Sequence, residues 1–269
     1  MSVGQLEDKV ALVTGSTRGV GEGIARVMAA DGAKVVVTGR NTDDGARVVK
    51  DIGTAGGTAH YIRVDFGDEQ DIKDAIAETK SVYGRLDVLV NNVAPTDHYG
   101  PGRTDNIITE LSSEGWRQIM NDALDSLFWV SKEALKLMIA EGGGAIVNIS
   151  SGVAREGMAG ASGYTASKGA MQSLTRSMAV EYAQHGIRCN CLILGPFRTA
   201  VVARLYDQHP KFKQAFEELT LLGRIGEPED VGHAVSFLAS DKASFITGVE
   251  FPLDGGMMCR MALPNLAVV

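Results

Sequence analysis

A short apolar run followed at once by a glycine-rich turn does most to limit the fold of this chain. The run covers residues 9–14, the turn carries Gly15, Gly19 and Gly21, and helical periodicity continues over residues 23–30. A strand, a glycine turn and a helix start in this order can bind an anion, because backbone N–H groups and the positive end of the helix dipole meet there. Many strand–helix turns need glycine for their backbone alone. The turn therefore indicates a dinucleotide site only together with the rest of the chain.

Strand and helix patterns alternate along the whole sequence. Further strands are expected at residues 34–38, 59–64, 86–91, 145–149, 187–194 and 249–253, and helices at 43–53, 68–83, 114–140, 164–184 and 229–239. This alternation predicts an α/β fold, a single-domain doubly wound (Rossmann) sheet of about seven parallel strands with helices on both faces. Because no repeat or linker interrupts the pattern, residues 1–269 are expected to form one dinucleotide-binding and catalytic domain.

Charge and cysteine usage exclude several classes of partner. The net charge is −7 without basic blocks, which argues against nucleic acid or an anionic membrane surface. Three cysteines and five scattered histidines form no metal-binding spacing, so we expect no metal site and a reduced, cytoplasmic setting. Cys189 and Cys191 alternate on an expected strand and are interpreted as core residues. No apolar run approaches the length of a membrane span.

The end of the second expected strand bears on the choice of dinucleotide. An acidic residue near this point holds the ribose hydroxyls of NAD, whereas arginine accommodates a 2′-phosphate. Here the strand ends at Arg40, and Arg18 lies in the glycine turn. The pair favours NADP(H) over NAD(H), because two guanidinium groups can bind one phosphate bidentately; the alternative is two solvated surface arginines. Asp43 and Asp44 fit the first turn of a helix capped by Thr42.

Polar and turn residues also follow the later strands. Asp65 could reach an adenine or cap the following helix, and Asn91 ends the fourth expected strand. Two segments, about residues 95–110 and 195–226, are rich in turn residues and are expected to select the substrate. The apolar tail, residues 257–269, is expected to pack on this subunit or on a neighbour.

A possible proton-transfer group lies between residues 144 and 170. Ser151 follows a buried strand, and Tyr164 and Lys168 are four apart, so they share one face of a helix. An ammonium group beside a tyrosine favours the phenolate and lowers the phenol pKa. Such a tyrosine can take a proton from an alcohol or return one to a carbonyl oxygen, to which Ser151 could donate a hydrogen bond. The alternative is an ordinary aromatic with an exposed lysine.

Taken in order, these features resemble the short-chain dehydrogenase/reductase family over nearly the whole chain. The resemblance is carried by residues 14–21, Asp65, Asn91-Asn92, Ser151 thirteen before Tyr164, the run Tyr164-Thr-Ala-Ser-Lys168, and residues 187–190, 195–199, 224–231 and 254–256. It implies that Tyr164 is the general acid/base, that Lys168 lowers its pKa and binds the nicotinamide ribose, and that Ser151 orients the carbonyl. It also implies cofactor contacts from Gly15, Thr17, Arg18, Gly19, Val20, Gly21, Arg40, Asp65, Phe66, Asn91, Ala94, Tyr164, Lys168, Gly195, Phe197 and Thr199.

The chain departs from the family pattern at three places. It has Val93-Ala94 where the family has Ala-Gly, Ala123 where a catalytic asparagine follows Trp116 by seven residues, and Leu194-Gly195-Pro196 where Pro-Gly is usual. Asn121 is on a different helical face from Ala123. The departures concern the proton relay and leave the Ser–Tyr–Lys set intact.

The resemblance implies an NADP(H)-dependent oxidoreductase, similar to 3-oxoacyl reductases, that transfers hydride between nicotinamide and a ketone or secondary alcohol. The alternative is an NAD(P)-binding sensor or scaffold with weak or no turnover. A homotetramer or homodimer joined through the two long helices is expected by the same resemblance. Arg155, Met158 and Phe197 are interpreted either as walls of the substrate pocket or as packing residues.

Overall fold

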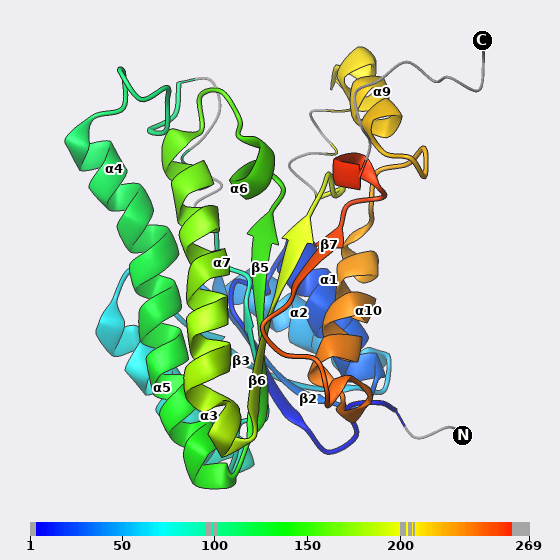
Figure 1. Cartoon of the computed structure of the whole chain (residues 1–269). Helices are drawn as coiled ribbons and strands as arrows, with labels where there is room; N and C mark the ends of the chain where they lie inside the picture. Colours follow the sequence, from blue (N-terminus) through cyan, green and yellow to red (C-terminus); the bar gives the residue numbers. More distant parts are fainter. Residues whose placement is uncertain are drawn as a thin grey trace.

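A computed structural model describes residues 4–94, 98, 102–199, 203, 206 and 208–259. Seven strands form one parallel sheet in the order β3-β2-β1-β4-β5-β6-β7 (Figure 1). The strands are β1 Val10–Val13, β2 Lys34–Gly39, β3 Thr58–Arg63, β4 Val88–Asn91, β5 Gly144–Ser151, β6 Ile187–Leu194 and β7 Glu250–Leu253. The predicted doubly wound sheet is confirmed. Its order reverses between β1 and β4, and sheets of this kind bind ligands at such a point, in a crevice outside the carboxyl ends of the strands.

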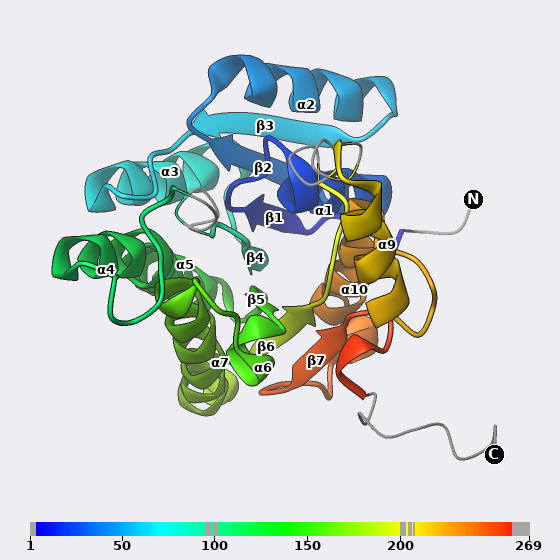
Figure 2. The same ribbon diagram turned by 90° about the horizontal axis from the view of Figure 1, so that it is seen from above.

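Helices cover both faces of the sheet, as Figure 2 shows from above. One face carries α1 Gly19–Ala30, α2 Thr42–Thr54 and α10 Pro228–Ala239, and the other carries α3 Glu69–Tyr83, α5 Ser126–Glu141 and α7 Ser162–Tyr182. The central strands are nearly continuous apolar runs because both of their faces are buried, as expected for a parallel sheet.

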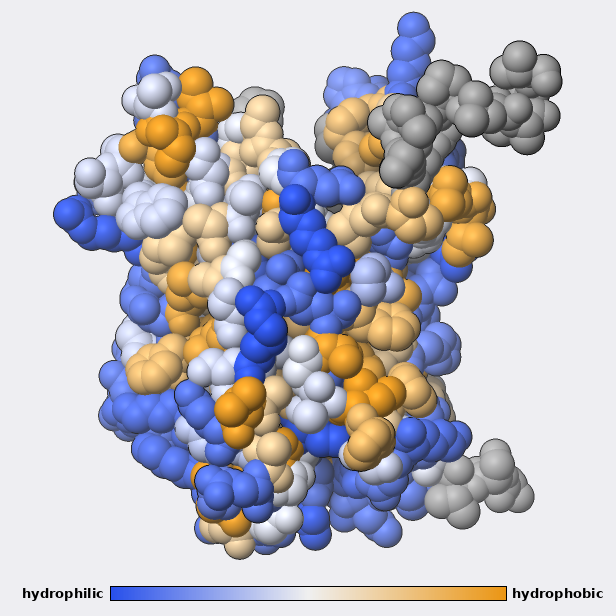
Figure 3. Space-filling model, in the orientation of Figure 1, coloured by the Kyte–Doolittle hydropathy of each residue, from blue (hydrophilic) through white to orange (hydrophobic). Residues whose placement is uncertain are grey.

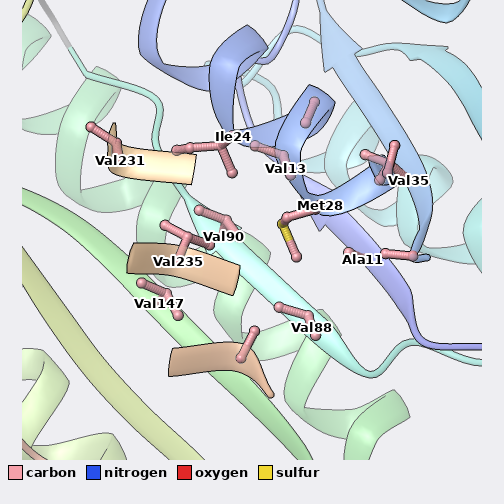
Figure 4. Close-up of a cluster of buried hydrophobic side chains, with 14 of the residues drawn as sticks. Ala11, Val13, Ile24, Met28, Val35, Val88, Val90, Val147, Val231 and Val235 are labelled. Atoms are coloured by element: carbon pink, nitrogen blue, oxygen red, sulfur yellow. The ribbon is translucent and has the colours of Figure 1, made fainter. Parts of the chain in front are cut away.

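Two hydrophobic clusters lie on opposite sides of the sheet. Figure 4 shows the cluster between the sheet, α1 and α10, which includes Val13, Val90, Val147, Ile24, Val231 and Val235. Here α1 and α10 approach closely, since a Cβ atom added at Gly23 would lie 2.4 Å from the Cβ of Pro228. The two clusters anchor the helices to the two faces of the sheet.

The long helix expected at residues 114–140 is interrupted. The structure has α4 Ser113–Met120, a π-helical turn Asn121–Asp125 and then α5. Within the turn the backbone N–H of Ser126 donates to the carbonyl of Asn121, five residues back. Such π turns are rare and frequently occur at functional sites. This one contains Ala123, the position of the family's catalytic asparagine.

Shorter elements surround the carboxyl edge of the sheet. They are α6 Val153–Glu156, α9 Pro210–Leu219 and the 3₁₀ turn Met257–Cys259. Two further 3₁₀ turns, Ala183–His185 and Asp241–Ala243, lie instead at the amino ends of the strands, before β6 and β7. The segment 195–226, which is rich in turn residues, thus also contains a helix, and the Tyr206 ring packs against the rings of Phe212 and Phe216 on α9. Of the expected substrate loop and tail, residues 95–97, 99–101 and 260–269 lie outside the described residues. Across the described ranges, each helix is too short or too polar to cross a membrane.

Candidate active site

The turn between β1 and α1 requires glycine at three positions. Gly15 and Gly19 adopt positive φ angles of 63° and 58°, and a Cβ atom at Gly21 would lie 2.3 Å from the carbonyl oxygen of Gly15. The side chain of Arg18, at the N-cap position of α1, does not cap the helix. The first N–H groups of α1 therefore face the turn, which is the arrangement that binds a pyrophosphate.

A cluster of charged side chains, Glu22 and Arg26 on α1 and Arg47 on α2, packs beside this turn. Arg47 on α2 donates to the carbonyl of Thr17 at 3.1 Å and to Glu22 at 2.8 Å, and Arg26 also donates to Glu22. Burial acts to raise the pKa of Glu22, but the hydrogen bonds from Arg47 and Arg26 outweigh it and hold that pKa below its usual value. The negative charge in the first turn of α1 is thus matched by two cations. Sequence patterns contained no signal for Arg47, since its contacts lie 25 to 30 residues away.

Arg18 and Arg40 are both exposed, the first in the glycine turn and the second directly after β2. The Tyr61 hydroxyl donates to the carbonyl of Gly39 at 2.7 Å and holds the end of that strand. Helix α2 is capped by Asn41, whose side chain accepts from the backbone N–H of Asp44 at 3.0 Å. The expected Thr42 cap is therefore wrong, because Thr42 is already the first helical residue.

Asp65 lies in the turn that follows β3. Its carboxylate accepts from the backbone N–H of Gly67 at 3.1 Å, whereas α3 is capped by Asp68. The alternative in which Asp65 caps that helix is therefore wrong. Phe66 is 9% exposed and packs in the core on the α3 side of the sheet.

The side chain of Asn91 points into the protein interior. Its amide donates to the Asn148 carbonyl oxygen at 2.8 Å and to the Ser131 hydroxyl at 3.1 Å, and Asn148 donates in turn to Thr175 at 2.8 Å. This buried network holds β4, β5, α5 and α7 together. Asn91 could therefore line a cofactor path through its main chain, as could Ala94. The neighbouring Val93 packs against the glycine turn.

Tyr164 and Lys168 come together near the carboxyl end of β5, the strand that Ser151 ends. Ser151 ends β5, Tyr164 lies in the first turn of α7, and Lys168 is one turn further on. The Lys168 ammonium is 2% exposed, donates to the carbonyl of Ile149 at 2.7 Å and lies 5.8 Å from the centre of the Tyr164 ring. Burial lowers the pKa of Lys168 from its ordinary 10.5 to about 8. The alternative of an exposed lysine is wrong.

The first turn of α7 is held by a residue far away in the sequence. Ala161, at its N-cap position, makes no side-chain bond to the helix, and Asp105 instead accepts from the backbone N–H groups of Gly163 and Tyr164. Sequence reasoning missed Asp105, because a carboxylate 58 residues before the helix gives no local capping signal.

The opposite wall of the crevice comes from the segments after β6 and β7. Thr199 lies over the glycine turn, 3.5 Å from where a Cβ atom of Gly19 would be, and Gly195 packs against Asp254. The Sδ atom of Met258 lies 3.2 Å from a Cβ atom built at Gly152, directly after Ser151. Figure 3 shows the hollow between the side that carries α4 and α6 and the side that carries α9.

Of the three residues interpreted as walls of the substrate pocket or as packing residues, two make packing or ion-pair contacts with other parts of the protein. The Phe197 ring is 9% exposed and packs against Gly226, so it belongs to the core. Arg155 pairs with Glu250 on β7 at 2.7 Å. Met158 is 40% exposed beside the first turn of α7 and stays a candidate. In the part of the chain that the structure describes, no three His, Cys, Asp or Glu side chains are grouped to hold a metal ion.

Comparisons with known proteins find similar dehydrogenases and reductases. Residues 15–258 match a family model described as enoyl-(acyl carrier protein) reductase. The chain is 38% identical over 251 residues to cis-4-hydroxycyclohexanecarboxylate dehydrogenase of Sinomonas cyclohexanicum, covering 93% of this chain and 96% of that protein. It is 33% identical over 252 residues to the 3-oxoacyl-[acyl-carrier-protein] reductase of Chlamydia pneumoniae, covering 94% and 98%. A short-chain type dehydrogenase/reductase from Mycobacterium ulcerans has a similar solved structure, with a TM-score of 0.87, 31% identity and coverage of 98% and 94%.

Proposed function

The chain belongs to the short-chain dehydrogenase/reductase family, and from this premise we propose that it is an NADP(H)-dependent oxidoreductase acting on a ketone or secondary alcohol. Membership makes it a nicotinamide-dependent dehydrogenase/reductase. The finer assignment of substrate class, cofactor and catalytic residues is the proposal. One observation carries the proposed catalysis, namely the buried Lys168 ammonium beside the Tyr164 ring at the carboxyl edge of the sheet.

In this proposal Tyr164 transfers the proton. A positive charge beside the ring favours the phenolate, so Tyr164 can accept the proton of an alcohol or return one to a carbonyl oxygen. Ser151 donates a hydrogen bond to that oxygen as its charge grows. Gly15, Thr17, Gly19, Val20 and Gly21 hold the pyrophosphate. Nicotinamide, when bound, supplies or accepts the hydride.

The direct test is NADPH oxidation by the purified protein with a panel of cyclic ketones, diketones and 3-oxoacyl esters. The reverse assay uses secondary alcohols and NADP⁺. Relatives named for cyclohexane alcohols and for 3-oxoacyl groups support this choice of panel. Tight NADPH binding without turnover of any carbonyl or alcohol would instead favour the sensor or scaffold.

The preference for NADP(H) rests on Arg18 and Arg40. Because charge-assisted hydrogen bonds to phosphate contribute about 1.5–3 kcal/mol, the Arg40→Ala variant is expected to raise the KM for NADPH by roughly 10- to 100-fold and to leave the KM for NADH almost unchanged. Steady-state kinetics with both cofactors measure this. Arg85→Ala is the control, because this arginine precedes β4 at the amino ends of the strands, whereas Arg40 follows β2 at the carboxyl ends. An unchanged NADPH/NADH preference in Arg40→Ala would contradict the assignment.

We also propose that the protein is a homodimer or homotetramer joined through α5 and α7. These helices expose Phe128, at 51%, and Val180, at 82%, and a shallow groove lies between them at Leu124, Asp125, Phe128, Ala170, Ser173, Leu174 and Ser177. Exposed apolar side chains on neighbouring helices are typical of a subunit contact. Val180→Asp is expected to lower the mass measured by light scattering to that of a smaller species, whereas Val82→Asp on α3 leaves it unchanged. The same mass for Val180→Asp and wild type would rule out this interface.

A cytoplasmic location is also proposed, supported by three unpaired cysteines.

A further inference from the structure

Three consecutive N–H groups at the start of α7 are satisfied by one loop. Asp105 accepts from Gly163 at 2.9 Å through Oδ1 and from Tyr164 at 2.8 Å through Oδ2. The carbonyl of the next residue, Asn106, accepts from Ser162 at 3.4 Å. A helix N-terminus has free N–H groups and a positive dipole end, so a carboxylate held there is well matched in charge.

The Asp105 side chain is buried, and both of its carboxylate oxygens accept hydrogen bonds. It is 3% exposed, and both oxygens are occupied, since Oδ1 also accepts from the backbone N–H of Asn106 at 2.9 Å. Within the described ranges no cation forms an ion pair with it, so backbone N–H groups supply its partners. A buried carboxylate that lost them would carry a large desolvation cost, so the geometry around it is closely specified.

The same loop is also tied to the π-helical turn. The backbone N–H of Asp105 donates to the carbonyl of His98 at 2.6 Å, and the His98 ring contacts the Asp122 carboxylate at 2.6 Å. The loop thus joins two features of the site, namely the turn that contains Ala123 and the backbone of Tyr164.

We propose that Asp105 is a positioning residue for Tyr164. It holds the first turn of α7 so that the phenol hydroxyl stands at the distance that proton transfer requires, and it acts through the backbone rather than on the substrate. The inference rests on the proposed role of Tyr164 as acid/base. Since a displacement of about 1 Å can lower a rate by roughly 100-fold, loss of this bond pair should affect chemistry far more than cofactor binding.

A purely structural cap would give a different pattern, and a second buried aspartate provides the comparison. Asp87 is 9% exposed and accepts from the backbone N–H of Val10 at 2.9 Å. It directly precedes β4, so it lies at the amino end of that strand, whereas the active site lies at the carboxyl ends. Asp105→Ala and Asp87→Ala should therefore both lower Tm by several degrees.

The experiment compares wild type, Asp105→Ala, Asp105→Asn and Asp87→Ala for carbonyl reduction with NADPH and for NADPH affinity by fluorescence titration. Asp105→Ala is expected to lower kcat by roughly 100-fold with NADPH affinity within about twofold of wild type. Asp105→Asn keeps one acceptor and should recover part of the loss. Asp87→Ala should keep the wild-type kcat.

Equal kcat losses in Asp105→Ala and Asp87→Ala would overturn the proposal, as would a loss confined to NADPH affinity. If Asp105→Ala does not fold, Asp105→Asn makes the comparison, and a wild-type kcat in that variant overturns the proposal too. A wild type that turns over no carbonyl would refute the proposed function itself, and the role of Asp105 with it. Turnover in wild type with an unaffected Asp105 variant would refute this inference alone.

Discussion

Replacing Tyr164 with phenylalanine is expected to lower kcat for carbonyl reduction by on the order of 100- to 10,000-fold, the range that general acid–base catalysis supplies. The change removes one hydroxyl and keeps the ring beside Lys168. Because the ring and the buried Lys168 ammonium keep their places, NADPH affinity should stay within about twofold of wild type. A large loss in kcat with little change in binding is the pattern of an interaction that acts in the transition state.

The measurement is steady-state NADPH oxidation with the best carbonyl of the panel, accompanied by an NADPH titration. Tyr182→Phe is the matched control, because Tyr182 ends the same helix about five turns from Tyr164. Its kcat should equal that of wild type. If Tyr164→Phe retained most of the activity, another group would have to move the proton, and the proposed assignment of the acid/base would be wrong.

The fold and the juxtaposition of Tyr164 and Lys168 were predictable because their signals in the sequence are local or periodic. Alternating apolar strands and amphipathic helices specify a parallel sheet through burial on both faces. Tyr164 and Lys168 are four residues apart on one helix, so their shared face follows from helix geometry. Ser151 was predicted to follow its strand, whereas β5 runs two residues beyond the predicted end and includes Ser151 as its last residue.

The rest depended on contacts between distant segments. Asp105 reaches the start of α7 across 58 residues, and Arg47 reaches the glycine turn across 30. Capping rules search for a partner within the helix's own first residues, so they assigned Thr42 and could not find Asp105. The π turn at Asn121–Asp125 leaves the apolar spacing of the long helix almost unchanged, which conceals it from a search for period 3.6. An apolar residue such as Phe197 fits a core and a pocket equally, and only its packing against Gly226 decides.

The second large effect is expected at Lys168, where activity and stability should change in opposite directions. Lys168→Met should lower kcat by at least about 100-fold, since the charge that favours the phenolate is lost. The same variant should be more stable than wild type at pH 7. The fall in the Lys168 pKa from 10.5 to about 8 corresponds to about 3 kcal/mol of desolvation cost. Loss of the bond to Ile149 offsets about 1 kcal/mol of that gain, which leaves about 2 kcal/mol.

The pH dependence separates this explanation from better packing by methionine. Below pH 8 Lys168 is charged in both the folded and the unfolded chain, so wild type carries the whole desolvation cost. Between pH 8 and 10.5 the unfolded chain binds more protons at this group than the folded one, so the contribution of Lys168 to wild-type stability rises with pH. The difference in the free energy of urea unfolding between Lys168→Met and wild type, measured at fixed protein concentration, should therefore shrink from pH 7 to pH 9.5.

Lys136→Met, at an exposed position of α5, should differ little from wild type in this free energy at either pH. An advantage for Lys168→Met that stayed constant with pH would mean that packing, and not the buried charge, sets its stability. In that case the buried charge of Lys168 would not be the source of a trade-off between stability and activity.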